Sequence, residues 1–143
     1  MGNSKPLMNP DDSGAEFARE MLSGDMTAGI NFDRLQKHPE KGYIIFEYLL
    51  CEEDQPIVTP YTSHPNKYWF KNSRKFISLY EVAEKLEAKL VLVNYAKKGT
   101  KHEDEILVMN VTSCTDEKIE TKDTRMTRET FKAWFRKLNA ECL

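Results

Sequence analysis

The sequence has little of what the familiar catalytic and nucleotide-binding motifs require. It contains six glycines among 143 residues. They do not form G-x-x-x-x-G-K-[ST], G-x-G-x-x-G or G-x-S-x-G, and H-E-x-x-H is also absent. A glycine-rich loop that cradles phosphate is therefore not expected, and P-loop nucleotide hydrolases and serine hydrolases are excluded. No cofactor is expected.

Cysteine is also scarce, and its spacing is uninformative. Cys51, Cys114 and Cys142 are odd in number, far apart and without a C-x-x-C pair. This pattern gives neither a disulfide framework nor metal-ligand spacing. We interpret the three as small apolar side chains of a reduced, cytoplasmic protein, and no metal site is predicted.

Long apolar runs and strong net charge are missing too. No run approaches the roughly 18 residues that span a bilayer, and the N-terminal "MGNSKPLMNPDDSG" lacks the apolar core of a secretory signal. An intracellular protein with no membrane partner is therefore expected. The net charge of −2 means that any attraction to nucleic acid must come from a local patch.

The composition, 40% hydrophobic and 31% charged, fits one globular domain. Residues 1–15 are polar and rich in turn formers, which predicts a flexible tail that orders, if at all, on a partner. Residues 16–143 are predicted to form a single domain.

The first half of that domain is predicted to contain two short helices and a strand pair. "AEFAREML" and "INFDRLQK" have apolar residues at helical spacing, and the second helix must end before Pro39. "GYIIFEYLLCEEDQPIVTPY" has two β-prone runs around a turn-prone "EEDQP", which favours a hairpin or two neighbouring strands, with a helix as the alternative. Alternation in the first run divides the side chains between two faces: Ile44, Phe46 and Tyr48 against Ile45, Glu47 and Leu49.

The second half gives clearer signals. Ser78 and Glu81 have capping-box spacing and predict a helix over 79–87. A dense apolar run predicts a central strand at 90–95, and a short polar connection predicts an antiparallel strand at 106–111. "KIETK" predicts an edge strand, and Thr127 is expected to cap a helix over 128–140 whose apolar stripe contains Phe131, Trp134, Phe135 and Leu138.

This order of elements predicts an α+β fold, a mainly antiparallel sheet with helices packed on it. The residues expected to be buried are Leu86, Val91, Val93, Trp134, Phe135 and Leu138.

The segment "HPNKYWFKNSRKF", residues 64–76, has four basic side chains, four aromatic rings and no acid. Single-stranded nucleic acid is held by cations along its phosphates and by rings stacked on its bases. The predicted nucleic-acid-binding residues are Lys67, Tyr68, Trp69, Lys71, Arg74 and Lys75. Two alternatives stay open: the rings pack inward while the cations are solvated, or the segment contacts an acidic protein surface.

Two other functions compete with this interpretation. A metal-dependent nuclease would need Glu47, Asp54 and a distant lysine, but the one well-placed E-x-K, Glu87 to Lys89, falls at a helix–strand junction. An adaptor or inhibitor would bind proteins through residues 1–15 and make no nucleic-acid contact. The sequence favours a non-enzymatic binding protein that engages nucleic acid, or a complex that handles it, through residues 64–76.

Overall fold

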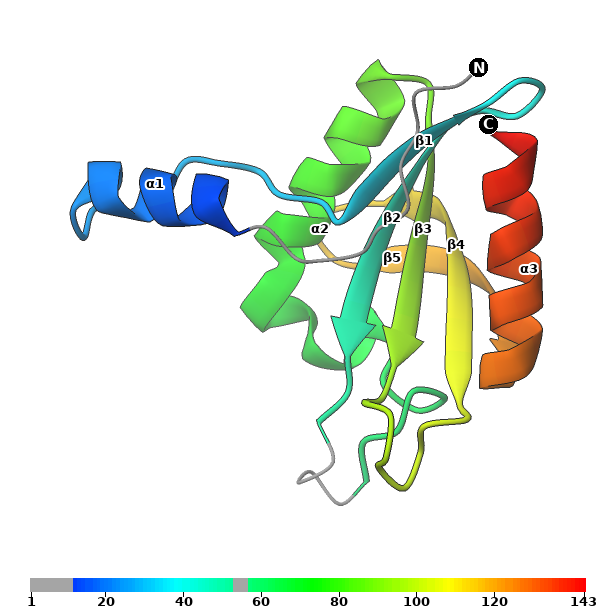
Figure 1. The fold of residues 1–143 in the computed structure, drawn as a ribbon. Coiled ribbons are helices and arrows are strands. Elements are labelled where there is room, and N and C mark those ends of the chain that lie inside the picture. The colour runs from blue at the N-terminus through cyan, green and yellow to red at the C-terminus, as the bar shows by residue number, and fades with distance from the viewer. Residues whose placement is uncertain (1–11, 53–56) are drawn as a thin grey trace. The chain divides into compact units, whose positions relative to one another are not determined.

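The computed structural model of the chain describes residues 12–52 and 57–143. The three α-helices of these residues are separated along the chain by groups of strands (Figure 1). In chain order the elements are α1 (Ser13–Leu22), β1 (Arg34–His38), β2 (Gly42–Leu50), the 3-10 helix η1 (Pro65–Tyr68), α2 (Trp69–Lys85), β3 (Lys89–Tyr95), β4 (Ile106–Cys114), β5 (Ile119–Met126) and α3 (Arg128–Glu141).

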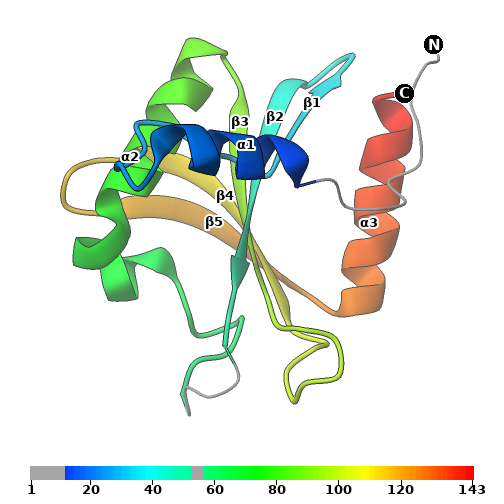
Figure 2. The same ribbon diagram turned by 60° about the vertical axis from the view of Figure 1, so that its left-hand side comes forward.

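The five strands form one sheet in the order β1-β2-β3-β4-β5. All neighbours pair antiparallel except β2 and β3, which are parallel and are connected through α2. Helices α2 and α3 pack on opposite faces of this sheet (Figures 1 and 2). The predicted α+β class is therefore confirmed.

Each face of the sheet has its own apolar core. On the α2 side, Ile45 and Leu92 pack with Phe76, Leu79 and other buried residues. On the α3 side, Phe46 and Val93 pack against Leu138 and the half-buried rings of α3. The two faces of β2 are divided as the sequence alternation predicted.

The predicted central strand and the elements that follow it are confirmed. β3 lies in the middle of the sheet and pairs antiparallel with β4, and α3 covers the predicted range. Thr127 caps α3, because its side chain accepts a hydrogen bond from the Thr130 backbone N–H at 3.1 Å.

Half of the predicted core is fully buried. Val91, Val93 and Leu138 are fully buried, whereas Trp134 and Phe135 are half-buried. The prediction for Leu86 is wrong, since it is 39% exposed. α2 ends at Lys85, so Leu86 is its C-cap and the chain leaves the helix through a left-handed turn at Glu87 (φ 53°).

The predicted start of the helix over 79–87 is also wrong. α2 begins at Trp69, nine residues before Ser78, so the Ser78–Glu81 pair lies inside the helix. The real N-terminal signal precedes η1, where the His64 side chain accepts from the Asn66 N–H at 3.1 Å and Pro65 takes the first helical position. Sheet-facing residues then recur at helical spacing from Trp69 to Ala83.

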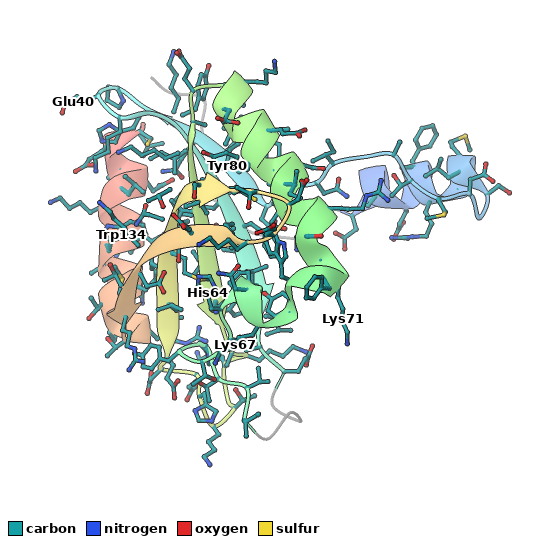
Figure 3. All side chains as sticks on the ribbon, turned by 180° about the vertical axis from the view of Figure 1, so that it is seen from behind. Glu40, His64, Lys67, Lys71, Tyr80 and Trp134 are labelled. Atoms are coloured by element: carbon teal, nitrogen blue, oxygen red, sulfur yellow. The ribbon has the colours of Figure 1, made fainter. Side chains whose placement is uncertain are left out.

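The predicted helix at "INFDRLQK" is wrong, and part of it is strand β1. Arg34–His38 pair antiparallel with Gly42–Phe46, and the Asp33 backbone N–H extends the ladder by donating to the Phe46 oxygen at 3.2 Å. The Asp33 carboxylate accepts the Tyr48 backbone N–H at 2.8 Å. The hairpin turns near Glu40 (Figure 3) and closes at Gly42, whose φ of +77° suits glycine. The expected partner strand after "EEDQP" is not formed over residues 57–61.

α1 belongs to an N-terminal unit that is compact separately from residues 32–142. None of its residues is buried, and Phe17 and Met21 are more than half exposed. It begins at Ser13, within the range assigned to the tail, and residues 1–11 lie outside the described residues. Within the described parts of the chain, no helix is long and apolar enough to cross a membrane.

Two phenylalanines of α2 provide a matched test of this arrangement. Phe76 is 1% exposed and Phe70 is 98% exposed. Phe76→Ala should lower the free energy of unfolding by about 3–5 kcal/mol, as buried aromatics do, while Phe70→Ala should change it by no more than about 0.5 kcal/mol. Urea denaturation of both variants measures the difference, and equal effects would mean that α2 is turned differently on the sheet.

Candidate nucleic-acid interface

The basic-aromatic segment 64–76 is helical from Pro65 onward. Two of its rings point into the core, whereas most of its cations are exposed to solvent. Trp69 is 3% exposed and stacks on Phe76, with ring centroids 5.9 Å apart. Its indole N–H donates to the backbone oxygen of Asp116 at 2.9 Å. Both the ring and the polar atom of Trp69 are thus used inside the protein.

Tyr68 is half-buried beside the same cluster, with its ring centroid 6.4 Å from that of Phe76. Burial raises the pKa of Tyr68 to about 12, so its hydroxyl is neutral at physiological pH. The stacking role predicted for Trp69 does not fit its buried position, and Tyr68 offers only part of its ring.

Three of the four cations are on the outer side of this region. Lys67, Lys71 and Arg74 are exposed and follow one another at helical spacing. In the part of the chain that the structure describes, none of the three forms a salt bridge. Lys67 and Lys71 lie at the N-terminal end of this helical region, across the sheet from Trp134 of α3 (Figure 3).

Phe70 lies among these cations and is 98% exposed. We name Lys67, Phe70, Lys71 and Arg74 the α2 basic face. The first turn of α2 has no acidic side chain, so the partial positive charge of the helix N-terminus adds to that of the lysines.

Lys75, the fourth predicted cation, has an internal partner. Its ammonium nitrogen lies 2.8 Å from a carboxylate oxygen of Glu47, whose side chain is only 6% exposed. Burial raises the pKa of Glu47 above its ordinary value of 4.5, Lys75 opposes that rise, and the nearby Asp33 adds to it. Lys75 therefore compensates a buried carboxylate and is not free to hold phosphate.

The structure describes only some of the residues that a nuclease site would need. Glu47 does lie beside a lysine, but Asp54 lies outside the described residues. Over residues 12–52 and 57–143, no three His, Cys, Asp or Glu side chains are grouped so as to hold a metal ion. Glu87 is in the turn after α2 and Lys89 opens β3, and both side chains are exposed.

η1 and the start of α2 are anchored to the edge strand β5 by polar side chains. Asn66 pairs with the backbone of Ile119 in both directions, at 2.8 and 2.9 Å, as a strand would. His64 Nε2 lies 2.8 Å from the Thr121 hydroxyl oxygen. Because Nδ1 of His64 accepts a backbone N–H and burial lowers the pKa of this histidine, it is a neutral donor to Thr121.

Comparisons of this chain with known proteins do not assign it to a family. No family model matches the chain, and neither the curated proteins nor the solved structures include a significant match.

The Glu47–Lys75 pair predicts a pH-dependent effect on stability. Lys75→Met should lower the free energy of unfolding by about 1–3 kcal/mol at neutral pH, because an ionised Glu47 then lacks its cation. The folded-state pKa of Glu47 is raised, so as pH falls toward 4.5 the carboxyl takes up a proton and the loss should shrink. Thermal unfolding of both proteins across this range measures it, and a pH-independent loss would show that the pair does not act through charge.

Proposed function

We propose that the protein is a nucleic-acid-binding protein whose α2 basic face contacts the phosphate backbone. The observation that carries the proposal is the alignment of Lys67, Lys71 and Arg74 on the solvent side of one helical segment. These cations have no carboxylate partner among the described residues. Lys67 and Lys71 lie near a helix N-terminus without a first-turn acid, which reinforces the positive potential there.

The burial of the rings argues for backbone contact over base stacking. Trp69 and Phe76 are in the core, so among the aromatic side chains of residues 64–76 only Phe70 is fully presented to a partner. A row of stacking platforms is what single-strand binding without sequence preference uses. A convex helix with three cations instead supports contacts to phosphates, which carry no sequence information.

An acidic protein surface is the second candidate partner, and Phe70 is the observation that favours it. A nearly fully exposed aromatic ring surrounded by cations has the composition of an interface anchor. Removing such an anchor should weaken binding to a protein far more than binding to phosphates.

Charge reversal on the α2 basic face tests the proposal. Lys71→Glu with Arg74→Glu should weaken binding to labelled DNA and RNA duplexes of unrelated sequence alike. It should also flatten the dependence of log affinity on log salt by roughly 0.9 for each phosphate that the variant no longer neutralises. The matched control is Lys85→Glu with Lys89→Glu, which makes the same charge change at exposed positions beyond the basic face.

Equal weakening in the two double variants would mean that only net charge matters and would contradict the proposal. Absence of binding by the unmodified protein to any duplex at low salt would also contradict it. If Phe70→Ala leaves duplex binding within about twofold, phosphate contact is supported. A decrease of roughly tenfold or more from that change alone would instead indicate an anchored interface.

A further inference from the structure

A second surface combines aromatic rings with cations, and it lies on the other face of the sheet. A cavity of about 560 Å³ opens between residues 128–136 of α3 and the ends of β2 and β3. This volume falls in the range of about 300–1,000 Å³ that small-molecule sites occupy. We name it the α3 groove.

The floor of the α3 groove is aromatic and apolar. Four half-buried rings line it, those of Tyr48, Tyr95, Phe131 and Phe135. Phe131 and Phe135 stack with centroids 5.4 Å apart, and Phe135 meets the buried ring of Phe46 edge-on at 5.4 Å. These contacts hold the rings in place, so the floor is formed before any ligand arrives.

The rim of the groove is strongly basic. Lys98, Arg128, Lys132 and Arg136 line it with a single carboxylate, that of Glu129. Arg128 is fixed by donating to the backbone oxygens of Glu103, at 2.8 Å, and of Ala96, at 2.6 Å. Lys132 and Arg136 follow it at successive four-residue steps along α3 and have no salt-bridge partner in the described ranges.

The groove also lies where α/β sheets commonly bind ligands. Tyr48 and Tyr95 are near the carboxyl ends of β2 and β3, the one parallel pair in the sheet. In open sheets, the region beyond the carboxyl ends of parallel strands is the usual place for small-molecule binding. Two segments far apart in sequence, β3 and α3, thus meet around one concave, basic and aromatic surface.

We propose that the α3 groove binds a nucleotide, with its base against the aromatic floor and its phosphate at the Lys132–Arg136 side of the rim. Planar aromatic rings stack on bases, and paired cations hold a phosphate by charge-assisted hydrogen bonds. A purely apolar ligand would leave the rim cations unused, and a simple anion would leave the floor exposed. Only a ligand that is both aromatic and anionic matches floor and rim together.

This site does not depend on the proposed duplex binding, because the α2 basic face and the α3 groove lie on opposite faces of the sheet. The nucleotide is either free or the terminal nucleotide of a single strand, since both present the same base and phosphate. Competition between a free nucleotide and a single strand for the groove distinguishes the two possibilities.

Titration of the full chain with three probes, followed by calorimetry and amide chemical shifts, tests the ligand chemistry. AMP should bind at least about tenfold more tightly than adenosine, which lacks the phosphate, and than ribose 5-phosphate, which lacks the base. The shifts should centre on residues 128–136 and on Tyr95. A short single strand with a 5′-phosphate should compete with AMP if a strand terminus is the source, and fail to compete if the free nucleotide is.

Charge reversal at one rim position tests the place of binding. Lys132→Glu should weaken AMP binding by about tenfold or more, whereas Lys137→Glu, the same change at an exposed position of α3 outside the groove, should leave it within about twofold. Phe131→Leu keeps an apolar side chain but removes a stacking ring, so it should weaken AMP binding and leave ribose 5-phosphate binding unchanged.

Several results would overturn the groove proposal while leaving the duplex proposal intact. They are no AMP binding, equal binding of AMP and ribose 5-phosphate, or equal effects of the Lys132 and Lys137 changes. Loss of AMP binding in the Lys71→Glu, Arg74→Glu variant but not in Lys132→Glu would place the nucleotide on the α2 basic face and overturn the groove as its site.

Discussion

The stacking of Trp69 on Phe76 against the sheet determines which side chains of α2 are exposed to solvent. The two rings lie nearly parallel, at 13°, and both are almost fully buried. The indole N–H is satisfied by the Asp116 oxygen, which joins the start of α2 to the β4–β5 turn. With these positions fixed inward, helical geometry places Phe70, Lys71 and Arg74 outward.

Partly buried polar contacts then hold α2 against rotation about its axis. The Glu47–Lys75 pair joins the second turn of α2 to β2, and Asn66 and His64 join η1 to β5. Apolar packing alone is non-directional, whereas each of these contacts requires one geometry. The polar contacts therefore specify which side of α2 faces solvent, and so which cations are available to a partner.

The same sheet carries a different surface on its other face, and there the rings stay half-exposed. α3 has fewer buried side chains than α2, Leu138 being the buried residue in it, so Phe131 and Phe135 line a groove instead of closing a core. A basic-aromatic composition thus occurs twice in this fold. On α2, Trp69 and Phe76 are buried and the cations face solvent beside one exposed ring, that of Phe70. At α3, rings and cations share one concave surface.

Local patterns in the sequence predict the parts of this fold that local interactions form. The apolar run of β3 and the stripe and cap of α3 are of this kind, and both are where the sequence placed them. β1 was missed because its strand state comes from pairing with β2, and Arg34–His38 has no strong strand signal of its own.

The start of α2 was missed because the Ser78–Glu81 spacing imitates a cap, while the real one at His64 has no standard capping residue. The candidate site could be predicted only in part, for a related reason. The cations of residues 64–76 are evident in the sequence, but the direction of Trp69 depends on Asp116 and the sheet, which are distant in the chain. The α3 groove could not be predicted at all, since Tyr48, Tyr95 and Phe131 meet only in the folded protein.

The proposal that the α2 basic face binds through charge rests on Trp69 being a core residue. Trp69 and Trp134 are the two tryptophans of the chain, so Trp134→Phe leaves Trp69 as the single emitting indole. A buried Trp69 should give a blue-shifted emission, protected from acrylamide, that neither shifts nor is quenched when a saturating oligonucleotide is added. A red-shifted emission open to acrylamide, or quenching by the bases of a bound strand, would contradict it, because Trp69 would then be exposed and stacked on nucleic acid.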